Sequence, residues 1–163
     1  ALLELSHEFD YILWCFGMPD SVFCIGGQYS ALDLDVEDLA EIVLKYTKPN
    51  RIISIHLDFL QRSAARCCKF IGTDGTLIWD GIADSIETQF GPHDYRNAKF
   101  GPFSDDRNAM YMEEIQHFLD CVGERSAPLI DGAQGAAVLS IVNAARQSLE
   151  SGSVVYLEYN VHV

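Results

Sequence analysis

The spacing of the apolar residues changes twice along this chain of 163 residues, and these changes limit the folds that it can adopt. Residues 2–16 follow a helical period, residues 21–90 form short runs separated by turns, and residues 111–149 return to a helical period. Residues 154–159 form a last run with strand composition. This order predicts an α+β fold with a mainly antiparallel, open-faced sheet and helices packed on one face.

Six strands are predicted in the middle of the chain, at residues 21–29, 39–46, 51–59, 66–71, 76–80 and 82–90. The run 39–46 could also be helical on composition, but the turn at residues 47–50 and the β-branched run after it favour a hairpin. Residues 91–106 are dense in Gly, Pro, Asp and Asn, which predicts a surface loop. Loops of this length are often functional or mobile, so we expect the most flexible segment here.

Two helices are predicted after this loop. The first carries an apolar stripe from Tyr111 and ends before Gly123, and the second starts at the N-cap candidate Asp131 and stops at Gly152. A chain of this length with 48% apolar residues predicts a single domain over residues 1–163.

Helices on one face of a sheet leave the other face to be covered. The pairs Ile52-Ile53 and Val154-Val155 place apolar side chains on both faces of their strands. An exposed apolar face commonly marks an association surface, which predicts a homo-oligomer through the open sheet face. The alternative is that a loop covers this face.

Charge and cysteine content exclude several classes of partner. Eleven basic against 24 acidic residues give a net charge of −13, which repels nucleic acid and anionic membranes. The five cysteines are odd in number and lack a C-x-x-C pair, so we expect reduced, buried thiols. The chain shows neither a leader sequence nor a long apolar run, which predicts a cytoplasmic protein.

Common active-site motifs are also missing from the sequence. The five histidines are scattered without an H-x-x-x-H pair, so no metal site is predicted. No G-x-S-x-G elbow is present for a nucleophilic serine, and neither of the glycine-rich nucleotide loops occurs. Gly26-Gly27 is too short a run to hold phosphates. We therefore expect no cofactor to be bound by this chain itself.

The first predicted helix carries a histidine among acidic side chains. Glu4, His7, Asp10, Tyr11 and Trp14 share a stripe beside the apolar one. A histidine can take a proton from a substrate hydroxyl near neutral pH or return it, and Glu4 is close enough in sequence to orient the imidazole. The alternative is a partly exposed amphipathic helix whose polar residues have no chemical role.

Four segments together resemble the C-terminal domain of the Gfo/Idh/MocA oxidoreductases, the family of glucose–fructose oxidoreductase and inositol dehydrogenase. They are residues 3–11 with Trp14 and Gly17, residues 37–46, residues 57–62 with 72–80, and residues 108–111 with Glu114, Phe118 and 131–132. Each motif alone is weak, but the four occur in the order of the family and cover nearly the whole chain.

The resemblance implies a role for the histidine. In this family an amino-terminal Rossmann domain binds NAD or NADP, and its lysine works with a histidine of the C-terminal domain on a sugar or polyol hydroxyl. By this resemblance His7 is the acid/base or hydroxyl-binding residue, with Glu4 as the residue that orients it. Asp10 and Tyr11 are substrate-binding candidates from the same helix.

Arg62 and Asn108 are two further candidates for the substrate pocket. Their alternatives are a solvated charge at a strand end for Arg62 and a helix cap for Asn108.

The chain lacks the nucleotide-binding half of the family. It therefore resembles a separate substrate-binding and oligomerisation domain of an NAD(P)-dependent sugar or polyol dehydrogenase, inactive by itself. The alternative is a catalytically inert binding or dimerisation module. The substrate stays open among nucleotide sugars, free hexoses, inositols and acylamino sugars.

Overall fold

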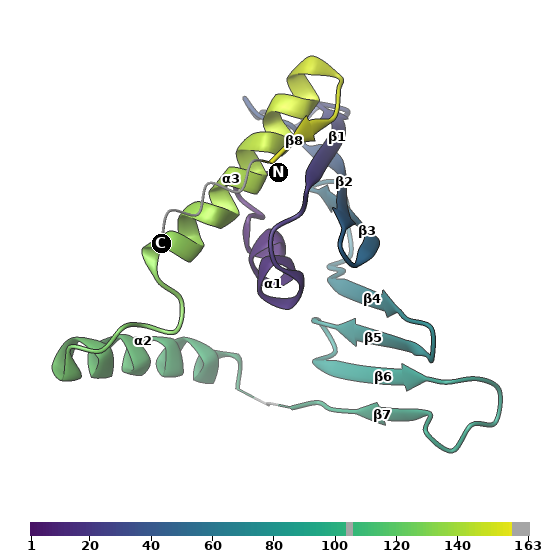
Figure 1. The fold of residues 1–163 in the computed structure, drawn as a ribbon, viewed down its shortest axis with the longest axis vertical. Helices are drawn as coiled ribbons and strands as arrows, with labels where there is room; N and C mark the ends of the chain where they lie inside the picture. The colour runs from purple at the N-terminus through teal and green to yellow at the C-terminus, as the bar shows by residue number, and fades with distance from the viewer. Residues whose placement is uncertain (104–105, 158–163) are drawn as a thin grey trace. The chain divides into compact units, whose positions relative to one another are not determined.

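The computed structural model describes residues 1–103 and 106–157, which form two compact units (Figure 1). The first unit joins Ala1–Leu60 to the chain from Leu129 onward, and the second is Gln61–Pro128. No helix in the described part of the chain has the length and apolar character needed to cross a membrane.

The described residues of the first unit form two helices and one sheet. Its elements are α1 (His7–Phe16), β1 (Ser21–Gly27), β2 (Leu39–Thr47), β3 (Asn50–Asp58), α3 (Gly132–Ser151) and β8 (Val155–Tyr156). The strands pair antiparallel in the order β3-β2-β1-β8. The predicted last strand, residues 154–159, is shorter in the structure, and its final two residues lie outside the described part of the chain.

The second unit contains the other sheet and one helix. Its elements are β4 (Cys67–Ile71), β5 (Thr76–Asp80), β6 (Ser85–Gln89), β7 (Ala98–Phe100) and α2 (Arg107–Glu124). The strands again pair antiparallel, in the order β4-β5-β6-β7. The α+β class and the antiparallel pairing are confirmed, and the strands are divided between two sheets of four.

The core of the first unit lies between one face of its sheet and the two helices. In β2 the residues Ala40, Ile42, Leu44 and Tyr46 are buried and alternate with exposed ones, which is the period of a strand and not of a helix. The side chains of α1 and α3 that pack on this face include Phe9, Ile12, Ile141 and Val142. Figure 1 shows both helices beside this sheet.

The predicted helix ends are confirmed for α3 but not for α2. Asp131 caps α3, accepting hydrogen bonds from Ala133 N and Gln134 N, and Gly152 ends the helix at a φ of 64°, as expected. The predicted end of the other helix before Gly123 is wrong, because α2 continues to Glu124.

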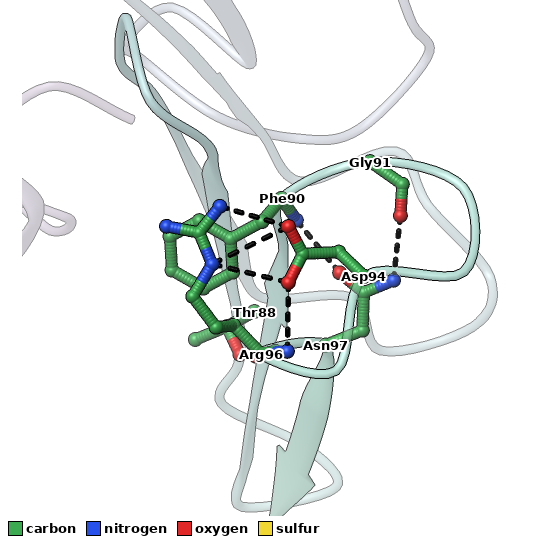
Figure 2. A network of polar contacts seen from close by, with 6 residues as sticks. All are labelled: Thr88, Phe90, Gly91, Asp94, Arg96 and Asn97. Atoms are coloured by element: carbon green, nitrogen blue, oxygen red, sulfur yellow. Dashed lines mark hydrogen bonds and ion pairs between the residues drawn. The ribbon is translucent and has the colours of Figure 1, made fainter.

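Within the predicted loop 91–106 the chain forms a short strand, β7, and a polar network holds the turn before that strand (Figure 2). Residues 104–105 of this predicted loop lie outside the described part of the chain. Asp94 binds Arg96 through its carboxylate, and the guanidinium lies 4.2 Å from the Phe90 ring centroid. Asn97 accepts from Phe90 N at 2.7 Å and donates to Gly91 O at 2.7 Å. Hydrogen bonds from Arg96 lower the pKa of Asp94 to about 2.

The cysteines are all free thiols, but the expectation that they are buried holds for only some of them. Cys15 and Cys67 are exposed, whereas Cys24 and Cys121 are buried. Burial raises the pKa of the Cys24 thiol to about 11, with the Glu37 charge adding to the shift.

Ser148 joins α3 to β1, and we expect its removal to destabilise the first unit. Its fully buried hydroxyl accepts from Cys24 N at 2.9 Å and donates to Ser153 O at 2.6 Å. Ser148→Ala leaves both groups without this partner, which should lower the free energy of unfolding by about 1–3 kcal/mol in urea titrations. The exposed Ser151→Ala is the control, and an equal loss in both variants would contradict this role for Ser148.

Candidate functional site

Helix α1 presents His7 at its first residue while its opposite face holds the helix in place. Phe9 and Ile12 are buried in the core, and Leu2 before the helix is fully buried as well. Leu2 N donates to Glu37 Oε1 at 2.7 Å, which fixes the segment that leads into the helix. His7 lies two residues from Phe9, about 200° around the helix, so it turns away from the core, and its side chain is 52% exposed.

The carboxylate in contact with His7 is that of Glu8. His7 Nε2 lies 3.1 Å from Glu8 Oε1, and the Glu8 side chain is mostly buried. Glu4 lies exposed in the turn before the helix and, among the described residues, makes no hydrogen bond or ion pair with His7. The contact between His7 and Glu8 is not predicted from the sequence, because adjacent residues of a helix point in different directions. At the first turn, however, both side chains can reach one another.

Asp10 and Tyr11 follow His7 on α1 and are half-buried. Tyr11 packs in part against the core of the first unit. Trp14, one helical turn beyond Asp10, is 75% exposed. The predicted polar stripe of this helix therefore presents side chains at its surface, beside a face that is buried.

Arg62 and Asn108 belong to the second unit, not the first. Arg62 is exposed in the bend between β3 and β4, which agrees with the alternative of a solvated charge. Asn108 is exposed within the first turn of α2. The cap of this helix is Asp106, which accepts from Asn108 N at 2.8 Å, so the alternative that Asn108 is the cap is wrong.

The second unit also has a shallow pocket of about 390 Å³. It is lined by Glu87, Gln89, Gly91, Pro92 and Asn97. Gln89 Nε2 donates to Glu87 Oε1 at 2.7 Å, and the Asn97 amide is used within the loop. The polar groups of this pocket already bind one another, which makes it a weaker candidate than the His7 surface.

The described residues do not fit a dinucleotide cofactor or a metal ion. Gly26 sits within β1, where an added Cβ would lie 2.3 Å from Leu39 O, so this glycine serves the close pairing of two strands. In the described part of the chain no glycine-rich turn joins a strand to a helix, which a phosphate cradle of that kind needs. No group of three His, Cys, Asp or Glu side chains converges there as a ligand set for a metal.

The structure also brings together a polar cluster on the first sheet that the sequence analysis did not predict. His56 lies between Glu41 and Asp58, on the face of the sheet away from the helices. The register of β2 and β3 places Glu41 opposite His56. This register was not predicted from the sequence, so the pair was not identified.

Comparison with known proteins decides the family. The family described as "Oxidoreductase family, C-terminal alpha/beta domain", that of the Gfo/Idh/MocA proteins, matches residues 1–157. The chain belongs to the Gfo/Idh/MocA oxidoreductase family. This match confirms the resemblance to the Gfo/Idh/MocA family that the four sequence segments showed. No curated protein matches the chain in sequence.

Solved structures share the fold of this Gfo/Idh/MocA domain. The WlbA dehydrogenase from Bordetella pertussis, in complex with NADH and UDP-GlcNAcA, has a TM-score of 0.73 and 22% identity over 96% of this chain and 47% of its own. UDP-N-acetylglucosamine 3-dehydrogenase GnnA from Acidithiobacillus ferrooxidans has a TM-score of 0.72 and 20% identity, over 90% of this chain and 45% of its own.

A third structure similar to the Gfo/Idh/MocA domain is aldose-aldose oxidoreductase from Caulobacter crescentus, complexed with glycerol. Its TM-score is 0.76 and its identity 17%, over 93% of this chain and 45% of its own. The chain thus spans somewhat less than half the length of each of these three proteins.

Proposed function

We propose that this chain is the substrate-binding domain of an NAD(P)-dependent dehydrogenase that oxidises a CH–OH group of a sugar or polyol. The observation that carries the proposal is His7, a half-exposed histidine on a helix whose other face is fixed in the core. Family membership supports it, as do the nucleotide sugars and glycerol named with similar structures. Within this class the substrate is a molecule with several hydroxyl groups.

In this proposal His7 moves a proton. Oxidation of an alcohol to a carbonyl removes the hydroxyl proton and a hydride from the carbon, and His7 takes the proton on an imidazole nitrogen. Glu8 Oε1 lies 3.1 Å from Nε2 and can accept a hydrogen bond from the imidazole. Asp10 and Tyr11 on the same helix would bind neighbouring hydroxyl groups of the substrate. Arg62 and Asn108 remain separate candidates for binding substrate.

The nicotinamide cofactor is proposed only for the whole protein. Since the described residues of this chain do not fit a dinucleotide cradle, NAD or NADP would be held by other residues. This chain supplies the proton transfer and the contacts to substrate hydroxyls.

The experiment uses a protein that carries this chain together with a nucleotide-binding domain. Nucleotide sugars, free hexoses, inositols and acylamino sugars are offered with NAD or NADP, and reduced cofactor is followed by its fluorescence. We expect reduction with at least one of these classes. Binding of the cofactor without reduction by any class would instead support a catalytically inert module.

We further propose that the open face of the first sheet joins two copies of the chain. Its exposed apolar side chains are Ile25, Val43, Ile52 and Tyr156. On β2, Glu41 and Lys45 lie at equal distances on either side of Val43. A two-fold axis near Val43 would bring Lys45 of one copy toward Glu41 of the other, as a self-complementary interface requires.

A charge introduced on this surface should weaken association. Ile52 is 68% exposed, so Ile52→Asp should not disturb the core, but it places a carboxylate in the interface. We expect the dimer dissociation constant from sedimentation equilibrium to rise about tenfold or more. Ile71→Asp, at an isoleucine on β4 that is 77% exposed, is the control. A wild-type chain that stays monomeric at high concentration would reject the interface.

A further inference from the structure

His56 is held between two carboxylates from two directions. Its Nδ1 lies 2.6 Å from Glu41 Oε1 on the neighbouring strand, and its Nε2 lies 2.7 Å from Asp58 Oδ2 on its own strand. The Asp58 side chain is only 2% exposed, and its other oxygen accepts from Leu60 N at 2.7 Å. The imidazole therefore ties β2 to the end of β3.

The number of protons on His56 decides whether both contacts can form. A neutral imidazole has one N–H donor and one acceptor nitrogen, whereas ionised carboxylates only accept. With a neutral ring, one of the two short contacts would set a lone pair against a carboxylate oxygen. Only the imidazolium donates to Glu41 and Asp58 at the same time.

We propose that Glu41, His56 and Asp58 form a protonation-dependent clasp, closed while His56 carries both protons and open once it has lost one. In the closed state the three side chains carry a net charge of −1. In the open state the charge is −2, and one of the two strand contacts is lost. The clasp makes the end of β3 and the charge of the open sheet face respond to pH.

The strand register shows which other groups lie near the clasp. On this face β2 adds Lys45, four residues from Glu41 and about 13 Å away along the strand. From β1 the residue opposite Glu41 is Ile25, which is apolar. The carboxylate of Asp38, at the start of β2, is bound to Tyr29 N and Ser30. Helices α1 and α3 pack on the other face.

The direction of the pKa agrees with this geometry. The hydrogen bond to Glu41 raises the pKa of His56 most, burial opposes it, and Asp58 raises it further. A group whose pKa is raised on folding contributes stability below its unfolded value and loses it as the pH rises through the folded value. The clasp is thus closed below the pKa of an unfolded histidine and opens as the pH rises through the raised pKa of His56.

The test follows His56 directly in the chain by the ¹⁵N chemical shifts of its imidazole as the pH is raised. We expect the imidazolium to persist to a higher pH in the wild type than in Glu41→Gln or Asp58→Asn, while Glu150→Gln, an exposed charge on α3, leaves the titration unchanged. Thermal unfolding adds a second measurement. The midpoint of the wild type should exceed that of His56→Gln by about 1–3 °C near pH 6, and the gap should close near pH 9.

Two outcomes would overturn the clasp: a His56 titration that is the same in the wild type and in Glu41→Gln, or a neutral tautomer at mildly acidic pH. The consequence for association rests on the proposed interface, and sedimentation over the same pH range tests it separately. A dimer that weakens with rising pH in the wild type and not in His56→Gln supports it. A chain that is monomeric at every pH, with the titration as expected, rejects the interface and leaves the clasp standing.

Discussion

Replacing Phe9 by alanine is expected to lower the free energy of unfolding of the first unit by about 3–5 kcal/mol. The ring is fully buried in the core of that unit. Truncation removes its transfer free energy and leaves a cavity that close-packed neighbours fill only in part. Urea unfolding followed by circular dichroism measures the loss.

A matched control comes from the same helix. Trp14 is a larger aromatic residue of α1 but is 75% exposed, so Trp14→Ala should change stability by only about 0.5 kcal/mol. Amide hydrogen exchange then shows which part of the chain Phe9→Ala destabilises. Exchange should accelerate more in β1 and β2 than in β5. Equal losses in the two variants would mean that α1 does not pack as the structure shows.

The parts of the fold that sequence could predict are those in which local patterns and tertiary packing agree. The run 39–46 was ambiguous on composition, but its buried and exposed residues alternate, so the turn after it was the better guide. Asp131 and Gly152 were identified as helix ends because a cap and a left-handed residue leave local signals.

The parts that sequence could not predict depend on pairing between distant segments. β7 is three residues long within a loop-like composition and forms through its pairing with β6. The division of the strands between two sheets likewise depends on which edges pair, and hydrophobic spacing carries no information on that. For the same reason the Glu41–His56 contact, fifteen residues apart, could not be found.

The candidate site was predictable in its position but not in its contacts. The helical period placed His7 beside a buried stripe, and the structure shows it half-exposed there. Its neighbouring carboxylate is Glu8 and not Glu4, because the helix begins at His7 and leaves Glu4 in the preceding turn. A shift in where a helix starts changes which side chains meet, and sequence patterns locate helix ends poorly.

Replacing His7 by alanine is expected to lower the turnover number of the proposed dehydrogenase about 100-fold or more, if His7 is the proton relay. The His7 side chain is half-exposed, so its truncation should change the free energy of unfolding only slightly. Turnover is measured with saturating substrate and cofactor over a range of pH. His7→Ala should lose the part of the pH dependence that the imidazole contributes, and added free imidazole should restore part of the rate.

Further variants separate proton transfer from binding. His7→Gln keeps a hydrogen-bonding side chain without an exchangeable imidazole proton, so it should be as slow as His7→Ala but bind substrate more tightly. Glu8→Gln removes the carboxylate 3.1 Å from Nε2 and should lower turnover less than either change at His7, because the imidazole that takes the proton stays in place. His93→Ala, an exposed histidine of the second unit, is the control. Unchanged turnover in His7→Ala would reject the relay, and a loss confined to the Michaelis constant would make His7 a hydroxyl-binding residue.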